Sequence, residues 1–381
     1  MFPRIEHIDQ VKAAIVGCDE FVVAERDDYT VINYLVSNDS TFPPVVDDHS
    51  AIRRECRGLI FDKSGKLISR PFHKFFNVNE REETQASLID FTLPHVILDK
   101  LDGSMIRPIK IHGIWRLATK MGITDVALQA EEFIRDKEVY QQFFDFCEAS
   151  GMTPIFEWLS RKNRIVIDYP FDELVLLAIR DTLSGMYHNY QTLECMSLQF
   201  SGIGIVRQYP GTMKSMQNLI EYTKGLQGVE GFVVRFDTGY MVKVKGEWYV
   251  QIHKAKDQIN LEKNLIKMLI DNGIDDVLPF LMDNDKDRLV QYEYDFWNGV
   301  HRTVAELNTL FSVIRVDERK EFALNVSMQD KKFAPILFKM FDGHDAFQLI
   351  IDTIRKNINT KTKVNGIRWI FRTNWNEVNA E

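Results

Sequence analysis

A lysine in a tight turn is the residue of this sequence with the clearest chemical potential. The segment Lys100-Leu101-Asp102-Gly103-Ser104 directly follows an apolar run that is typical of a strand. A lysine at a strand end can present its amine into a cleft, and Gly103 permits a tight turn and close approach of the backbone to phosphate. The Lys-x-Asp-Gly pattern alone is weak evidence, because it arises by chance in on the order of one chain in ten of this length. An exposed turn is the alternative.

Two lysines on one strand face give a second indication. Lys243 and Lys245 alternate with Val242 and Val244, so the ammonium groups point one way and the valines point into the core. Adjacent ammonium groups on a mixed strand are unfavourable unless an anion lies between them, which favours a phosphate site. The expected strand that precedes this one opens with Glu230-Gly231. A solvated strand face is the alternative.

A carboxylate and several cations elsewhere fit nucleotide binding. Glu157 lies between two aromatic residues in an expected strand, and a Glu that faces a cleft accepts hydrogen bonds from ribose hydroxyls. Arg57 and Lys74 flank an expected hairpin at residues 58–69, within a stretch (53–81) of eight Lys/Arg and three Asp/Glu. The alternatives are an ordinary exposed strand Glu and solvated cations beside core aromatics.

Composition limits the class of protein. The 381 residues suit two domains, and 45% apolar with 27% charged residues indicates a globular protein. Without an eighteen-residue apolar run or a signal-like start, we expect a cytoplasmic protein with no membrane span. The net charge of −8 argues against indiscriminate coating of nucleic acid, but it permits a local basic groove. Four cysteines without metal-ligand spacing indicate free thiols.

The hydrophobic pattern changes near residue 255. Before it, the sequence predicts hairpins at 58–69 and 231–250, strands at 95–99, 165–167 and 174–179, and a helix at 127–147. After it, apolar residues recur at spacings of three and four over 261–269, 300–311, 333–341 and 346–358. We therefore predict an α+β chain with a domain at residues 1–254 and an all-helical domain at residues 255–381.

Together the chemical segments resemble the covalent nucleotidyltransferase superfamily of DNA ligases, RNA ligases and mRNA capping enzymes. Its ordered motifs are Lys-x-Asp-Gly, a Glu strand, Glu-Gly and Lys-x-Lys, and here they stand at Lys100, Glu157, Glu230 and Lys243/Lys245. Chance agreement of all four motifs is remote.

Over about residues 20–255 the sequence more closely resembles the RNA ligase 1 family of T-even phages, the tRNA-repair ligases. The segments that carry this resemblance are Glu55-Cys56-Arg57-Gly58, Ser69-Arg70-Pro71, Lys74-Phe75-Phe76-Asn77, Asn163-Arg164-Ile165-Val166 and Glu247-Trp248-Tyr249-Val250. Over the helical remainder the resemblance is confined to length and helical character.

The resemblance implies a fold and a reaction. The fold is an N-terminal nucleotidyltransferase domain (ATP-grasp-like ligase) of antiparallel sheets with flanking helices, followed by an all-helical C-terminal domain for RNA specificity. The reaction joins 5′-phosphate and 3′-hydroxyl ends of single-stranded RNA, such as a broken tRNA anticodon loop. It uses ATP, Mg²⁺ (or Mn²⁺), a lysyl-AMP and an RNA-adenylate. We expect a monomer, in the host cytoplasm if the gene belongs to a phage.

The resemblance also assigns catalytic roles. Lys100 is the nucleophile, and neighbouring cations and a metal ion lower the pKa of its amine. Asp102 and Gly103 shape the lysine loop, and Asp102 also engages metal or RNA ends. Glu230 binds Mg²⁺ or orients Lys100, and Asp275 in the helical domain is a further metal ligand.

The remaining implied residues bind the nucleotide. Glu157 holds the ribose. The phosphate contacts are Arg57, Lys74, Lys120, Lys243 and Lys245, and the other nucleotide contacts are Tyr34, Phe76 and Tyr249. Lys120 and Tyr34 match the family pattern more loosely than the others.

Other functions remain alternatives. DNA ligases and capping enzymes normally follow Lys-x-Lys with a β-rich OB domain, whereas the 136 residues after Lys245 are predicted to be helical. A catalytically silent RNA-binding adaptor on the same scaffold conflicts with the intact set of motifs. The basic stretch 354–373 either touches RNA or forms a solvated helix face with Trp369 buried.

Overall fold

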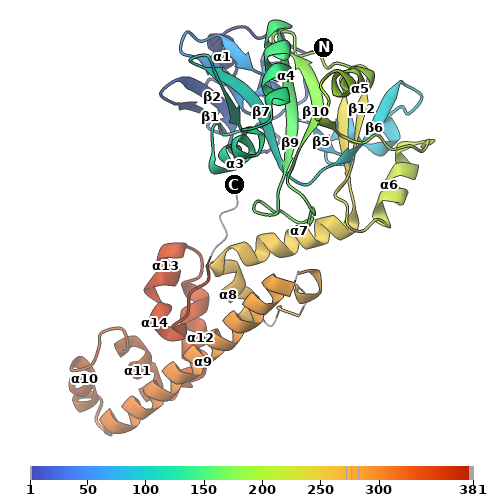
Figure 1. The fold of residues 1–381 in the computed structure, drawn as a ribbon. Coiled ribbons are helices and arrows are strands. Elements are labelled where there is room, and N and C mark those ends of the chain that lie inside the picture. Colours follow the sequence, from blue (N-terminus) through green and yellow to red (C-terminus); the bar gives the residue numbers. More distant parts are fainter. Residues whose placement is uncertain (1, 272, 276, 282, 377–381) are drawn as a thin grey trace. The chain divides into compact units, whose positions relative to one another are not determined.

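The computed structural model of the protein describes residues 2–271, 273–275, 277–281 and 283–376. The chain divides into two compact units, Met1–Val250 and Gln251–Glu381. The first unit combines strands with helices and the second is built of helices, which confirms the predicted α+β class (Figure 1). None of the helices in the described ranges has the length and apolar character needed to cross a membrane.

The first sheet of the first unit carries the predicted hairpin at 58–69. Its four antiparallel strands, in spatial order, are β1 (Phe21–Glu25), β2 (Tyr29–Tyr34), β3 (Leu59–Asp62) and β4 (Leu67–Ser69). The apolar sides of α1 (Ile8–Ala14) and α2 (Asp48–Glu55) share a core with this sheet. The Asp62 carboxylate closes the hairpin turn by accepting hydrogen bonds from the backbone N–H groups of Ser64 and Lys66, both at 2.9 Å.

The second sheet carries Glu157. Its five strands, in spatial order, are β11 (Gly204–Ile205), β10 (Glu173–Asp181), β9 (Met152–Leu159), β7 (Ser104–Ile111) and β8 (Ile114–Ala118). The helices that pack beside it are α3 (Asp125–Ile134), α4 (Glu138–Ala149) and α5 (Tyr190–Gln199) (Figure 1). The single helix predicted at 127–147 is thus two helices. The break falls at residues 135–137, three charged residues in a row with no apolar side chain to bury.

The third sheet carries the three motif lysines. Its strands, in spatial order, are β5 (Phe76–Asn77), β13 (Met241–Lys245), β12 (Gly231–Phe236) and β6 (His95–Lys100). Helix α6 (Met216–Lys224) packs against the apolar face of this sheet. The short 3₁₀ turns η1 (Glu82–Thr84) and η2 (Ala86–Leu88) follow β5. Most strand pairs are antiparallel as predicted, but β5 runs parallel to β13 and β11 runs parallel to β10.

Two strand predictions are wrong. Residues 165–167 form no strand, because the N–H groups of Val166 and Ile167 bond to a side chain, the Asp102 carboxylate. The hairpin predicted to reach residue 250 ends at Lys245, and helix α7 (Glu247–Asn260) begins instead. The buried residues of α7 are Tyr249, Ile252, Ala255 and Ile259, which follow helical spacing.

The second unit is helical as predicted. Its elements are α8 (Glu262–Ile270), η3 (Leu278–Phe280), α9 (Asp283–Ile314), α10 (Arg319–Ser327), α11 (Ala334–Phe341), α12 (Ala346–Lys356), α13 (Lys361–Gly366) and α14 (Arg368–Phe371). They enclose a single apolar cluster, against which Trp369 packs. Three cations of the basic stretch 354–373 form ion pairs inside this unit: Arg355 with Asp271, Arg368 with Glu262, and Arg372 with Glu306.

Candidate active site

Strand register places the three motif lysines on one face of the third sheet. Gly231 of β12 lies opposite both Lys100 of β6 and Lys245 of β13. Lys243 lies two residues before Lys245, and the intervening valines, Val242 and Val244, are buried on the other face as predicted. A Cβ on Gly231 would lie 2.0 Å from the carbonyl oxygen of Val244, so only glycine fits between the two lysine-bearing strands.

Glu230 joins two of these lysines. Its Oε2 atom lies 2.7 Å from Lys100 Nζ, and its Oε1 atom lies 3.0 Å from Lys245 Nζ. The Glu230 side chain is only 3% exposed. The anion between the lysines is therefore a side chain of the protein, and the charge nearest to Lys100 is negative.

Lys243 has no such carboxylate within the described ranges. Burial holds the pKa of its ammonium well below the usual value, and the charges of Arg57 and Lys100 lower that pKa further. Its Nζ lies 5.1 Å from the ring centroid of Phe75. A nearly buried ammonium among other cations is a site for an anion supplied by a ligand.

Asp102 fixes the loop after Lys100. Its Oδ2 accepts hydrogen bonds from the N–H groups of Val166 and Ile167, both at 2.7 Å, and its Oδ1 accepts one from the Tyr249 hydroxyl at 2.6 Å. The Asp102 N–H donates to the Tyr169 hydroxyl at 2.9 Å. These four bonds tie the lysine loop to residues 166–169 and to Tyr249, and the predicted roles of Asp102 in shaping the loop for catalysis and in contacting metal or RNA stay predictions.

Gly103 allows the lysine loop to lie against β9. A Cβ at this position would lie 2.3 Å from the carbonyl oxygen of Trp158, so the close approach, rather than a left-handed backbone, requires glycine. The Gly103 N–H donates to Glu157 Oε1 at 3.2 Å. Glu157 faces away from its buried neighbours Phe156 and Trp158. Burial raises the pKa of the Glu157 carboxyl to about 7, and the negative charge of Glu230 also raises it.

A second cationic cluster surrounds Tyr34 at the end of β2. Lys74 Nζ lies 4.8 Å and Lys120 Nζ lies 5.9 Å from the centroid of the Tyr34 ring. Burial opposes ionisation of the phenol, but the charges of Arg57, Lys74 and Lys120 together lower the Tyr34 pKa below its usual value. The structure therefore brings together Tyr34, Arg57, Lys74 and Lys120, two of which matched the family pattern only loosely.

The Phe76 ring packs against Lys74, one of the cations of this cluster. It is 1% exposed and packs on Phe42, with ring centroids 6.3 Å apart. Lys74 Nζ lies 5.3 Å above the Phe76 ring. Tyr249 is likewise buried, and its hydroxyl is directed at Asp102. In this structure both aromatics contact the protein core, and their predicted contacts with a nucleotide remain predictions.

Asp275 belongs to the second unit. It lies in an exposed turn, and its charge adds to burial in raising the pKa of Glu293. Across the described ranges no group of three or more His, Cys, Asp or Glu side chains is arranged to hold a metal ion. The role of Asp275 as a metal ligand stays a prediction.

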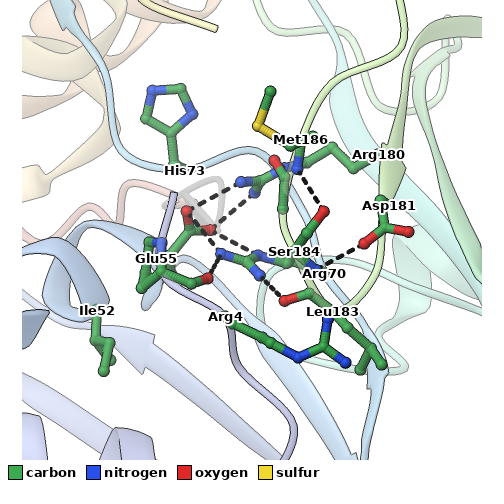
Figure 2. A network of polar contacts seen from close by, with 12 residues as sticks. Arg4, Ile52, Glu55, Arg70, His73, Arg180, Asp181, Leu183, Ser184 and Met186 are labelled. Carbon is green, nitrogen blue, oxygen red and sulfur yellow. Dashed lines mark hydrogen bonds and ion pairs between the residues drawn. The ribbon is translucent and has the colours of Figure 1, made fainter. Parts of the chain in front are cut away.

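The sequence analysis did not predict the buried network of ion pairs around Glu55, two residues before Arg57. Figure 2 shows the Glu55 carboxylate between the guanidinium groups of Arg70 and Arg180. Arg180 donates to Oε2 at 2.8 Å and to Oε1 at 2.9 Å, and Arg70 Nε donates to Oε2 at 3.1 Å. Burial opposes ionisation of Glu55, but the two arginines lower its pKa to about 2. The Arg57 N–H donates to the Glu55 carbonyl at 2.6 Å, so the network fixes the start of the Arg57 turn. The sign of this network in the sequence is Arg180, which directly follows the apolar run 174–179.

Comparison with known proteins gives the class of this protein. Residues 55–249, about half of the chain, match the sequence model of the RNA ligase family. The chain belongs to this family, and it is therefore an enzyme that ligates RNA. Residues 256–365 match the C-terminal domain of T4 RNA ligase 1, so the family resemblance found in the motifs is confirmed and extends over the helical unit.

Three known proteins illustrate what this chain is similar to. A putative RNA ligase of Thermovibrio ammonificans is 28% identical over 326 residues, which cover 82% of this chain and 83% of that protein. RNA ligase 1 of bacteriophage TS2126 is 26% identical over 260 residues, which cover 65% of this chain and 64% of the phage protein. A solved archaeal ATP-dependent RNA ligase superposes with a TM-score of 0.46 at 11% identity, over 84% of this chain and 85% of that chain.

Proposed function

We propose that this chain is an ATP-dependent ligase of single-stranded RNA that carries AMP on Lys100. The observation that supports this function best is the set of three lysines on one sheet face, with Glu230 between Lys100 and Lys245 and with Lys243 lacking a carboxylate partner in the described ranges. Such a face holds one amine in place and leaves positive charge for phosphates.

In the first step Lys100 attacks the α-phosphorus of ATP. The Lys100 ammonium loses two protons on its way to the uncharged nitrogen of the product: the first passes to Glu230 Oε2, 2.7 Å away, before the attack, and the second passes to solvent once the new bond has formed. A bond from Nζ to phosphorus forms, the bond from the α-phosphorus to the bridging oxygen of the β-phosphate breaks, and pyrophosphate leaves. Lys243 and Lys245 stabilise the charge on the phosphoryl oxygens.

Two transfers to RNA follow. An oxygen of the RNA 5′-phosphate attacks the same phosphorus, the bond to Nζ breaks, and Lys100 regains two protons. The 3′-hydroxyl oxygen of the other end then attacks the RNA 5′-phosphorus and gives up its proton to solvent, the bond from that phosphorus to the AMP oxygen breaks, and AMP leaves. The sum is joined RNA, AMP and pyrophosphate from one ATP and two ends.

The other residues of the first unit position the nucleotide in this proposal. Glu157, beside the lysine loop, accepts hydrogen bonds from the ribose hydroxyls. The phosphates are held by Arg57, Lys74 and Lys120, the cations that converge on Tyr34. Tyr34 contacts the nucleotide, and Phe76 and Tyr249 support these groups from the core.

The carboxylate of Glu230 can also serve as a ligand for a divalent ion. Mg²⁺ in nucleotide enzymes is bound by one or two carboxylates together with substrate phosphates, and Glu230 supplies such a carboxylate beside Lys100. When Lys100 carries AMP its nitrogen is uncharged, so Glu230 Oε2 then lacks its cation. Bound Mg²⁺ or Mn²⁺ would neutralise charge on the phosphate oxygens.

The proposal also names the RNA substrate. We further propose that the substrate is a broken tRNA anticodon loop and that the helical unit, whose residues 256–365 match the C-terminal domain of T4 RNA ligase 1, selects it. We further propose that the enzyme acts as a monomer in the cytoplasm.

Incubation with α-labelled ATP and Mg²⁺ tests the lysyl-AMP. Protein is first treated with pyrophosphate to remove AMP already bound. Wild-type protein should take up label, Lys100→Ala should take up none, and Lys12→Ala, which removes an exposed lysine, should match wild type. Absence of label on wild type would favour a silent adaptor, and label from GTP alone would favour capping.

A second assay tests the nucleic acid. Single-stranded 5′-phosphate RNA and nicked duplex DNA are offered at equal concentrations of ends. We expect sealing of the RNA. Preferential sealing of the nick would overturn the assignment of RNA as substrate.

A further inference from the structure

Arg107 is a buried cation without a carboxylate partner in the part of the chain that the structure describes. It lies in β7, four residues after Gly103, and its exposed fraction is 0%. The buried arginines Arg70 and Arg180, by contrast, share the carboxylate of Glu55. Burial lowers the pKa of the Arg107 guanidinium to about 9, and the charge of Arg57 lowers it further. Such an unpaired buried charge costs stability, and a bound anion would offset that cost.

The guanidinium joins two turns that carry the proposed phosphate ligands. Arg107 Nη2 donates to the carbonyl oxygen of Gly58, the residue after Arg57. Arg107 Nη1 donates to the carbonyl oxygen of Thr119, the residue before Lys120, at 3.3 Å. One side chain therefore anchors the backbone beside both cations.

The two turns are in direct contact at this point. A Cβ on Gly58, which has φ +99°, would lie 2.7 Å from the Cα of Lys120. The Gly58 N–H donates to the carbonyl of Ile32 at 2.9 Å, which ties the same turn to the strand of Tyr34. A small shift of Gly58 would therefore move Arg57 and Lys120 relative to Tyr34.

We propose that Arg107 is a positioning residue for the triphosphate: it locks Arg57 and Lys120 into converging positions, and its own charge is balanced when the nucleotide phosphates bind. This inference rests on the proposed function, because it takes those cations to be phosphate ligands. Preorganised positive charge in a water-poor setting stabilises phosphate more than the same charge at the surface.

The alternative, that Arg107 only stabilises the fold, predicts a different result for substitutions at this position. A glutamine can donate to one of the two carbonyl groups and keep the core closed, but it brings no charge. A lysine keeps the charge, but its single nitrogen cannot reproduce the fork that holds both carbonyl groups. If Arg107 only supported the fold, both substitutions would change thermal stability without changing the dependence of adenylylation on ATP concentration.

The test measures the initial rate of Lys100 labelling against ATP concentration for wild type, Arg107→Gln and Arg107→Lys, below the melting temperature of each. We expect the KM for ATP to rise by about ten- to a hundredfold in Arg107→Gln, and by less in Arg107→Lys. Sealing of pre-adenylylated RNA, which needs no triphosphate, should fall less than the efficiency of adenylylation.

Arg235→Gln is the matched control. Arg235 is also buried, and neither Nη1 nor Nη2 of its guanidinium has a hydrogen-bond partner in the described ranges. Its KM for ATP should stay at the wild-type value, whatever the change in its melting temperature. An unchanged KM in folded Arg107→Gln, or an equal rise in Arg235→Gln, would overturn the inference. If Arg107→Gln does not fold, an unchanged KM in Arg107→Lys would do the same. Loss of labelling in wild type would instead reject the proposed function itself.

Discussion

Lys100 Nζ lies 2.7 Å from Glu230 Oε2, so the proposed nucleophile is held by a carboxylate that enters from the start of the neighbouring strand. The same carboxylate holds Lys245 through its other oxygen at 3.0 Å. Two ammonium groups thus share one buried negative charge. Loss of that charge would leave both lysines without their counterion and would remove the nearest acceptor for the Lys100 proton.

The first prediction is that Glu230→Gln lowers the rate of Lys100 adenylylation by about 10²- to 10⁴-fold, the usual contribution of a positioned proton acceptor. The amide neither accepts the proton nor balances the two cations. The measurement is the initial rate of labelling from α-labelled ATP. Glu148→Gln makes the same chemical change at an exposed ion pair, 2.6 Å from Lys110, and should label like wild type. Wild-type rates in Glu230→Gln would remove this carboxylate from the mechanism.

The second prediction concerns the pH dependence that Glu157 adds. Its pKa is about 7 in the folded protein, mainly through burial, against an ordinary value of 4.5. Between these values the folded state binds more protons than the unfolded state, so the free energy of unfolding falls as pH rises from about 4.5 to about 7. The loss is on the order of 3 kcal/mol. Urea unfolding of wild type and Glu157→Gln over pH 5 to 8 measures it, and the variant should lack this part of the slope.

If Glu157 binds the ribose as proposed, its titration should also change the KM for ATP. The carboxylate form of Glu157 is the stronger acceptor for ribose hydroxyls, so the KM for ATP should fall as pH rises through about 7. In Glu157→Gln this trend should be absent. A variant with the same pH profile as wild type would show that another group titrates.

Local periodicity explains which parts of the site were predictable. Lys243 and Lys245 were placed on one face because strand side chains alternate, and that rule depends only on sequence neighbours. Helix α7 (Glu247–Asn260) has apolar residues at helical spacing, but its first residues include aromatic and β-branched types that favour a strand, so the sequence predicts a strand there.

The contacts that were missed join residues far apart in the sequence. Asp102 bonds to the hydroxyl groups of Tyr169 and Tyr249 across 67 and 147 residues, and Glu55 bonds to Arg180 across 125 residues. No local pattern specifies such pairs, because an arginine that ends an apolar strand has the same sequence signature whether it is solvated or buried. Tertiary packing decides between these cases.

The third prediction is that Tyr249→Phe costs about 1–3 kcal/mol of unfolding free energy, because Asp102 Oδ1 loses the hydroxyl donor of Tyr249 while it stays buried. The lysine loop should loosen, and the rate of adenylylation should fall with it. Tyr140→Phe removes another buried hydroxyl, whose oxygen lies 3.4 Å from the Leu174 carbonyl. That control should leave adenylylation unchanged. An equal loss of adenylylation in both variants would indicate a general effect of stability.

The fourth prediction concerns the buried network behind Arg57. Glu55→Gln removes the one negative charge between Arg70 and Arg180, and breaking a buried pair in this way costs about 3–5 kcal/mol. Because the Arg57 N–H donates to the carbonyl of Glu55, two residues earlier, the KM for ATP should rise as well. Calorimetry gives the first effect and labelling kinetics give the second.

Acid titration separates the charge of Glu55 from its packing. Burial opposes ionisation of this carboxyl, but Arg180 and Arg70 lower its pKa to about 2, so its contribution to stability is present above pH 4.5 and is lost as pH falls towards 2. The loss is about 3 kcal/mol, and Glu55→Gln should lack it. Glu262→Gln is the control, because Glu262 is a buried carboxylate that Arg368 holds at 2.7 Å in the helical unit. It should destabilise that unit without raising the KM for ATP. Equal KM values in the two variants would show that the Glu55 network supports the fold and does not position Arg57.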